Sequence, residues 1–181
     1  GFEDLTMEGT LAAVRLAREA CDGSAVDGDA TAGGDTAALG PALVAGSVSC
    51  HPPGMAHGAS MDKGQWPAPE VESAGYAEQA GLVRQGGADL VFVEMVWEWR
   101  QHGLPAARGA CASGLPVALC LAVFDAASCE EGTPQLHCGT PVEEVAREVS
   151  QGDGWEGVVA ICVHHTKLPL LPCLEALRRG G

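Results

Sequence analysis

Four nearly continuous apolar runs of strand length alternate with longer segments of helical periodicity, and this alternation is the strongest constraint on the fold. The runs are Leu43–Val48, Leu90–Val96, Val117–Val123 and Trp155–Val163. Strands that are apolar on both faces are typical of parallel sheets covered by helices. The sequence therefore predicts an α/β fold in which one helix is followed by four βα units.

Helical segments are predicted at the start of the chain and after each apolar run. The first covers about residues 11–20, with Thr6 or Thr10 as its cap, and the others cover 70–85, 97–113, 140–152 and 168–179. Thr140-Pro-Val-Glu-Glu predicts a helix start with a threonine cap, a proline in the first position and an acid in the third. Residues 22–41 lack periodicity and are rich in Gly, Ala, Asp and Thr, which predicts a surface loop or flexible insertion.

Two architectures fit this order of elements: a doubly wound open sheet and a (β/α)8 barrel of the TIM type. No Gly-x-Gly-x-x-Gly follows any predicted strand, which argues against a dinucleotide site. Four βα units are half a barrel, and a complete barrel takes about 250 residues. The chain begins with a helix that lacks its strand and ends directly after a helix. We therefore expect a partial barrel, incomplete at both ends.

The charge balance disfavours polyanionic partners. Asp and Glu outnumber Lys and Arg by 24 to 10, which gives a net charge of −14. Such a field repels nucleic acids and anionic membrane surfaces. No run approaches the roughly 20 apolar residues of a membrane helix, and the first residues lack the features of a signal peptide. The eight cysteines form no Cys-x-x-Cys pair, which predicts a reducing, cytoplasmic setting.

Four segments, in order, carry a resemblance to a known family. They are Val44-Ala-Gly-Ser-Val, the stretch from Tyr76 to Met95, Gly114-Leu-Pro-Val, and Val158-Val-Ala-Ile-Cys-Val-His-His-Thr. In this order the segments resemble the strand ends and lead-ins of the homocysteine S-methyltransferases, and they organise about residues 42–178. The resemblance implies that residues 1–181 are a partial homocysteine-binding barrel domain.

The same resemblance implies a zinc-dependent enzyme, an S-methyltransferase acting on homocysteine. In that family a zinc-bearing (β/α)8 barrel transfers a methyl group from a small donor to the homocysteine thiol, which gives methionine. Zinc supplies the thiolate that this chemistry needs, because it lowers the pKa of a bound thiol. Three cysteine ligands and the substrate sulfur complete a tetrahedron. The expected partners are therefore homocysteine and a small methyl donor.

The resemblance also implies roles for five residues, none of them assigned as a catalytic group. Glu94 matches the strand-end glutamate that reaches the substrate amino group, and Ser47 and Gly46 match small residues that allow close approach to the substrate. Cys162 matches the first zinc ligand. In a subgroup with a Val-Met-His-Thr-like strand end, the residue that faces the site would instead be His165. The Gly-Gly-Cys-Cys segment that supplies the family's other ligands does not occur in this chain.

Plainer interpretations stay open beside these roles. Cys162 could be a buried structural cysteine and Glu94 a solvated strand terminus, although an acid that ends so apolar a strand is costly without a partner. His164 and His165 could both be loop residues, and on an extended segment the two side chains would point in opposite directions.

Two other functions also fit the sequence. The first is a degenerate barrel domain that binds a small molecule or partner without catalysis, which the missing cysteine pair favours. The second is an unrelated parallel α/β enzyme that uses the loop after Val48 or Val163.

Overall fold

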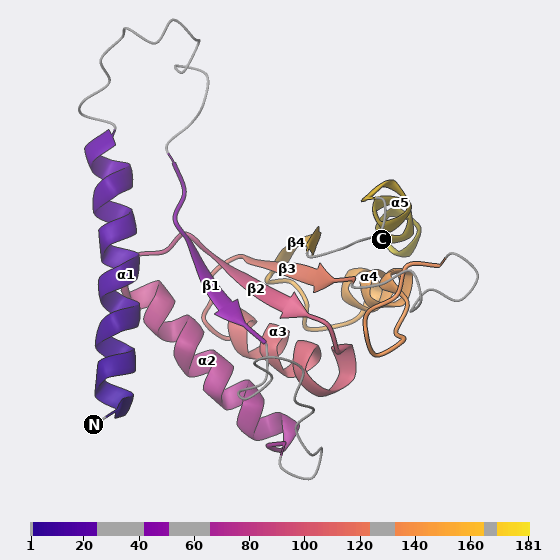
Figure 1. Cartoon of the computed structure of the whole chain (residues 1–181), viewed down its shortest axis with the longest axis horizontal. Helices are drawn as coiled ribbons and strands as arrows, with labels where there is room; N and C mark the ends of the chain where they lie inside the picture. Colours follow the sequence, from indigo (N-terminus) through magenta and orange to yellow (C-terminus); the bar gives the residue numbers. More distant parts are fainter. Residues whose placement is uncertain (1, 25–41, 51–65, 124–132, 165–169) are drawn as a thin grey trace, which may run out of the picture.

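The sheet has four parallel strands in sequential order, β1-β2-β3-β4 (Figure 1). In this computed structural model the described residues are 2–24, 42–50, 66–123, 133–164 and 170–181. The strands are β1 (Ala45–Ser49), β2 (Leu90–Val96), β3 (Val117–Ala122) and β4 (Val158–His164). Every apolar run that predicted a strand contains one, so the α/β prediction is confirmed.

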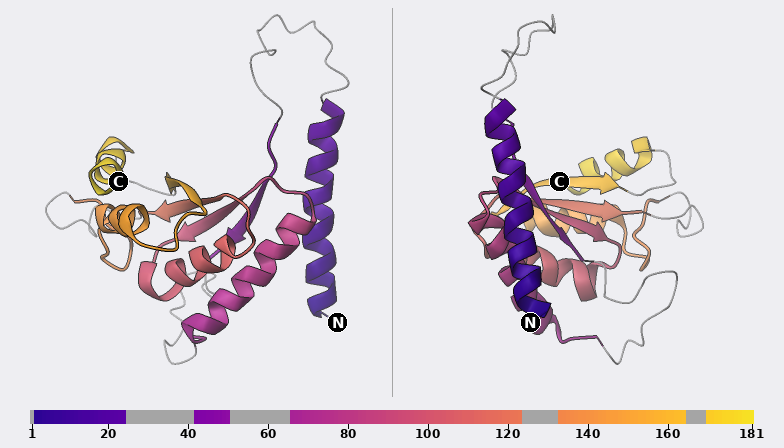
Figure 2. Two further views of the ribbon diagram at one scale, coloured as in Figure 1. Left: turned by 180° about the vertical axis from the view of Figure 1, so that it is seen from behind. Right: turned by 60° about the vertical axis from the view of Figure 1, so that its left-hand side comes forward.

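Helices alternate with the strands along the chain. They are α1 (Phe2–Ser24), α2 (Pro69–Gln85), α3 (Leu104–Cys111), α4 (Val142–Gln151) and α5 (Leu170–Gly180), with a π-helical turn, η3 (Trp99–Gly103), directly before α3. In Figures 1 and 2, α2 and α3 run along one face of the sheet and α1 stands beside the β1 edge. At the other end of the sheet, α4 and α5 pack against each other. No helix of the described ranges has both the length and the apolarity to cross a bilayer.

The strand order distinguishes the two architectures that the sequence allowed. A doubly wound sheet reverses its strand order and carries helices on both faces, whereas this order runs straight from β1 to β4 with α2 and α3 on the same face. Residues on the opposite face of β1 are exposed in strict alternation with buried ones. In a (β/α)8 barrel the helices cover the outer face of the sheet and the other face lines the interior. The arrangement here is that of half such a barrel, which confirms the predicted partial barrel.

The covered face of the sheet forms the core. Val48, Val91, Val93, Leu119 and Leu121 point to this side and are fully buried, together with alanines of α3. Two glycines allow the helices to approach. A Cβ at Gly46 would lie 2.0 Å from Val83 Cγ1 of α2, and one at Gly109 would lie 2.4 Å from the Ser73 carbonyl oxygen. Stability therefore depends on close packing on this face.

A polar anchor joins α1 to the sheet edge. Arg18 of α1 donates to the Gly87 carbonyl oxygen at 3.1 and 3.2 Å and forms an ion pair with Asp89. The same Asp89 carboxylate accepts a hydrogen bond from the Val44 N–H at 2.7 Å. The pKa of Asp89 is lowered, first by the Val44 N–H and then by Arg18.

Both predicted threonine caps are wrong. Helix α1 begins earlier than expected, so Thr6 and Thr10 lie inside it, and the Thr10 hydroxyl donates to the Thr6 carbonyl at 3.0 Å. Pro141 is the N-cap residue of α4, and the Thr140 hydroxyl accepts from Cys138 Sγ at 3.1 Å instead. Thr6 and Thr10 do not cap α1 because the helix begins before them, and Thr140 does not cap α4 because that helix begins one residue later than predicted.

The helix predicted over residues 97–113 begins two residues later and in another form. Trp97 lies outside the helix and Glu98 is extended. The Glu98 carboxylate accepts from the backbone N–H groups of Gln101 and His102 at the start of η3. A π turn of this kind widens the helix by one residue and redirects its side chains. Of the predicted insertion at 22–41, residues 22–24 belong to α1 and the rest lie outside the described residues.

Candidate functional site

The open face of the sheet carries polar side chains close to the carboxyl ends of its strands. Alternation places Ser47 and Ser49 of β1, Phe92 and Glu94 of β2, Cys120 of β3, and Cys162 and His164 of β4 on this side, opposite the valines and leucines of the core. In barrels of this type substrates bind at the carboxyl ends of the strands. This face is therefore the candidate site.

Glu94 of β2 and Ser47 of the edge strand β1 lie together on this face. The Ser47 hydroxyl donates to Glu94 Oε2 at 2.7 Å, and Ser49 is the register partner of Glu94. Ser47 is exposed and Glu94 is half-buried. A carboxylate held by a hydroxyl on a half-open surface can accept a further hydrogen bond from a ligand ammonium group.

The backbone at Glu94 is irregular. Met95 has φ 59°, in the left-handed region, and the pairing of β2 with β3 shifts register between Val93 and Val96. The Glu94 carbonyl accepts from the Cys50 N–H at 3.0 Å, and the Met95 N–H donates to His164 Nε2 at 2.9 Å. A bulge of this kind re-aims the side chain beside it.

Cys50 adds a side-chain contact to the same stretch. Its thiol donates to the Met95 carbonyl at 3.0 Å. Burial is the main cause that raises the pKa of Cys50 to about 12, so the thiol keeps its proton at neutral pH and can donate. Cys50 therefore holds Met95 in place and does not serve as a nucleophile.

Cys120 and Cys162 are register partners across β3 and β4. Burial, and then the neighbouring Cys162, raise the pKa of Cys120 to about 12. The described residues contain no group of three or more His, Cys, Asp and Glu side chains that could hold a metal ion. This donor set does not amount to a zinc site, so we derive no step through zinc.

The site residues expected from the sequence divide into three sets. Ser47 and Glu94 meet directly, and Cys162 lies on the same open face, two strands away from Glu94. Gly46 lies on the opposite face, against Val83 of α2. His165 falls outside the described residues.

Sequence analysis assigned no role to Cys50, and of the neighbouring pair His164 and His165 it favoured His165 as the residue that faces the site. The apolar run was expected to end at Val163, whereas β4 continues to His164. Had the strand been extended by one residue, the period of two would have placed His164 on the same face as Cys162. Cys50 follows the first strand in the same way, directly after its last residue.

A second polar cluster lies beneath η3. His102 is 1% exposed, and its Nδ1 lies 2.9 and 3.0 Å from the two carboxylate oxygens of Glu72. The rings of Trp97 and Trp66 pack on the imidazole, with centroids 6.1 and 4.5 Å away. His102 Nε2 has no partner within the described part of the chain. The dense ring packing is that of a buried structural pair.

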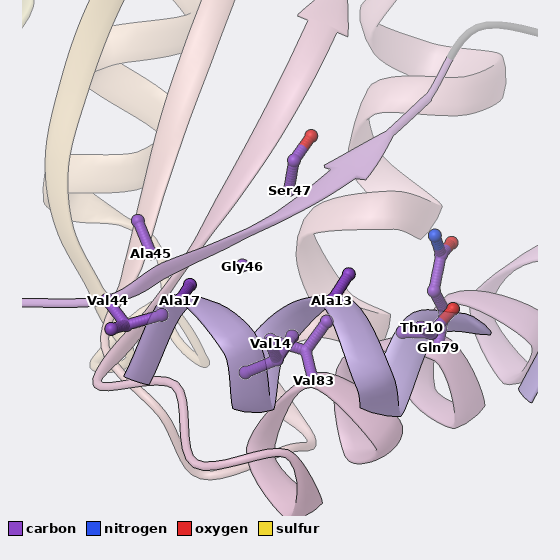
Figure 3. Close-up of a pocket in the computed structure, with 10 residues that line it drawn as sticks. All are labelled: Thr10, Ala13, Val14, Ala17, Val44, Ala45, Gly46, Ser47, Gln79 and Val83. Carbon is purple, nitrogen blue, oxygen red and sulfur yellow. The ribbon is translucent and has the colours of Figure 1, made fainter. Parts of the chain in front are cut away.

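The groove between α1 and β1 has a volume of about 300 Å3 and is shown in Figure 3. Most of its lining is apolar, and its polar members are Thr10, Ser47 and Gln79. In Figure 3 the Ser47 side chain points away from α1, toward the open face, while Val14 and Val83 meet below the strand. The groove offers no charged side chain to a ligand, so Glu94 remains the centre of the candidate site.

The fold and the site together define a class of protein: a half barrel with a carboxylate and a hydroxyl close to the carboxyl ends of its strands. A family model described as homocysteine S-methyltransferase matches residues 1–179. The chain therefore belongs to the homocysteine S-methyltransferase family.

Among solved structures, the chain is similar to the homocysteine methyltransferase MmuM from Escherichia coli in its apo form. The sequence identity is 19% and the TM-score is 0.55. The match covers 89% of this chain and 50% of that chain, so the chain spans about half the length of this neighbour. At this identity the likeness concerns the fold. A search among curated proteins found no match.

Proposed function

We propose that this chain forms the homocysteine-binding part of a barrel that transfers a methyl group to the homocysteine thiol. The observation that carries the proposal is the pairing of Glu94 with Ser47 on the open face, near the carboxyl ends of β1 and β2. Family membership supports the class of substrate. Glu94 would accept a hydrogen bond from the substrate ammonium group, and Ser47 would keep the carboxylate oriented toward it.

The reaction has a simple balance of atoms. The substrate sulfur, once it has lost its proton, attacks the methyl carbon of a small donor. A new sulfur–carbon bond forms, the bond between the methyl group and the donor breaks, and its electron pair stays with the donor. The contribution of the described residues is to bind and orient homocysteine, which makes the attack effectively intramolecular.

The zinc that the resemblance implies belongs to this proposal as an expectation. Cys162 would be its first ligand, with His165 as the alternative. The remaining ligands would come from residues outside the described part of the chain. Elemental analysis for zinc tests this expectation, with Cys162→Ser compared against Cys120→Ser. Zinc lost only from the Cys162 variant would assign that ligand, and zinc retained in both variants would remove Cys162 from the site.

Homocysteine binding to Glu94→Gln tests the main proposal. We expect the affinity to fall about 10- to 100-fold by calorimetry, because a charge-assisted hydrogen bond contributes about 1.5–3 kcal/mol. The matched control is Glu19→Gln, which makes the same charge change on an exposed position of α1 and should bind as the wild type does.

A ligand variant sharpens the same experiment. N-acetylhomocysteine keeps the thiol and carboxylate but lacks the ammonium group, so it should bind the wild type and Glu94→Gln equally weakly. If the acetylated compound still distinguishes the two proteins, Glu94 does not bind the amino group.

The second candidate is binding without catalysis. The donor set on the open face favours it, because Cys120 and Cys162 bring no third ligand within the described residues. In that case homocysteine binds and depends on Glu94, while no methyl transfer is detected with sulfonium, betaine or methyl-folate donors at saturating zinc. Turnover with any of these donors would rule this candidate out.

A further inference from the structure

The peptide that joins Glu94 to Met95 is held in a conformation that an ordinary strand does not adopt. Met95 is the non-glycine residue with positive φ in the described part of the chain, at 59°. For a side chain of this size the left-handed region is strained, and it persists only where neighbouring contacts impose it. The residue immediately before this strained position is the one that we assign to the substrate ammonium group.

Contacts from two different strands hold this peptide. On one side its carbonyl, that of Glu94, accepts from the Cys50 N–H just after β1, at 3.0 Å. On the other side its N–H, that of Met95, donates to Nε2 of His164 at the end of β4, at 2.9 Å. The Cys50 thiol fixes the next carbonyl, that of Met95, at 3.0 Å. The peptide plane beside Glu94 is thus fixed from both directions.

The contact from His164 has to cross β3 to reach β2. The strand order places β3 between them, and the register partner of His164 on β3 is Ala122. Since Ala122 has only a methyl group, an imidazole can extend past it along the open face. An acceptor nitrogen carries no proton, so the neutral ring has its proton on Nδ1.

We propose that His164 is a positioning residue for Glu94. By accepting the Met95 N–H, its imidazole stabilises the left-handed conformation of Met95, which directs the Glu94 carboxylate toward Ser47 and the ligand. This inference rests on the proposed role of Glu94. Without His164, Met95 relaxes toward the extended conformation, the bulge between Val93 and Val96 closes, and Glu94 loses its alignment with Ser47.

The contact itself can be measured without any ligand. In uniformly 15N-labelled protein we expect a through-hydrogen-bond coupling between the Met95 amide nitrogen and His164 Nε2. The coupling should disappear in His164→Ala and persist in His137→Ala, a control that removes an exposed histidine. A folded wild type in which Met95 shows no such coupling would overturn the proposal, whatever the protein binds.

Substrate affinity then tests positioning. We expect His164→Ala to bind homocysteine about tenfold more weakly, as for a lost hydrogen bond beside the binding group. His164→Gln, whose amide oxygen can accept the Met95 N–H, should recover most of the affinity. Adding Met95→Gly to His164→Ala should also recover part of it, because glycine adopts positive φ without strain.

The outcomes separate this inference from the proposed function. If Glu94→Gln loses affinity and His164→Ala keeps that of the wild type, the positioning role is wrong and the proposed function stands. If the wild type does not bind homocysteine, the proposed function fails. A crystal structure of His164→Ala then decides positioning alone: a Glu94 carboxylate still bonded to Ser47 overturns it, and a displaced carboxylate supports it.

Discussion

The two faces of the sheet are built from alternate residues of the same strands, yet one face forms the core and the other carries the candidate site. On the covered face, Val48 and Leu119 are fully buried and Gly46 lets α2 approach. On the open face, Ser47 is exposed, Glu94 is half-buried, and the Ser47 hydroxyl donates to the Glu94 carboxylate. The difference teaches that stability and ligand binding can change independently here, because neighbouring residues in a strand belong to opposite faces.

The largest effect should come from the core beside the open face. Leu119→Ala should lower the free energy of unfolding by about 2–5 kcal/mol, because it removes a fully buried side chain and leaves a cavity. Its neighbour Cys120 points to the other face and is also buried, but Cys120→Ala removes a single sulfur atom, so it should cost about 1 kcal/mol or less. Urea unfolding of both variants measures the difference. Equal losses would mean that the two faces do not differ in packing.

The covered face could be predicted well from the sequence because buried strands show directly as runs of apolar residues along the chain. Apolar runs located all four strands, and β2 matched its run, Leu90–Val96, residue for residue. The resemblance placed Glu94 and Ser47 at strand ends, and register then brought them together. Neither inference required knowledge of contacts between distant segments.

The remaining features of the site could not be predicted, since they depend on such contacts. The left-handed Met95 is an ordinary residue in an apolar run, and its conformation follows from Cys50 and His164, which lie 45 and 69 residues away along the chain. Gly46 was assigned to substrate approach. The structure places Gly46 against Val83, and this close packing alone explains why the position holds a glycine. A role in substrate approach stays a prediction.

Gly46→Ala and Ser47→Ala compare the two faces of the sheet at adjacent residues of β1. The new Cβ of Gly46→Ala would lie 2.0 Å from Val83 Cγ1, so we expect a loss of about 1–3 kcal/mol from overpacking. Ser47→Ala, one residue on, should change stability by no more than about 0.5 kcal/mol. Thermal unfolding measures both variants.

A second substitution identifies the cause of that loss. Val83→Ala added to Gly46→Ala removes the atoms that the new methyl group meets, so the double variant should regain part of the stability. A double variant that is destabilised by the sum of the two single effects would locate the cost of Gly46→Ala elsewhere, for example in the flexibility of β1.

The smallest effect should appear at the edge of the covered face, where α1 meets the sheet. The pKa of Asp89 is lowered by the Val44 N–H and by Arg18, so the ionised form stabilises the fold. A depressed folded-state pKa contributes stability that is fully present above the ordinary value of 3.8 and is lost as the pH falls through the lower folded value. Asp89→Asn should therefore be less stable than the wild type at neutral pH, and the difference should shrink in acid.

Hydrogen exchange in α1 and acid unfolding followed by circular dichroism check this prediction. Asp22→Asn is the matched control, because Asp22 faces the same Arg18 at 3.7 Å but is 68% exposed and should change little at any pH. If Asp89→Asn remains as much less stable than the wild type below the folded pKa of Asp89 as it is at neutral pH, α1 is held by contacts other than the ionised carboxylate. Packing of Val14 against the Gly86 backbone, where an added Cβ would lie 2.6 Å from Val14 Cβ, would then be the main attachment of α1.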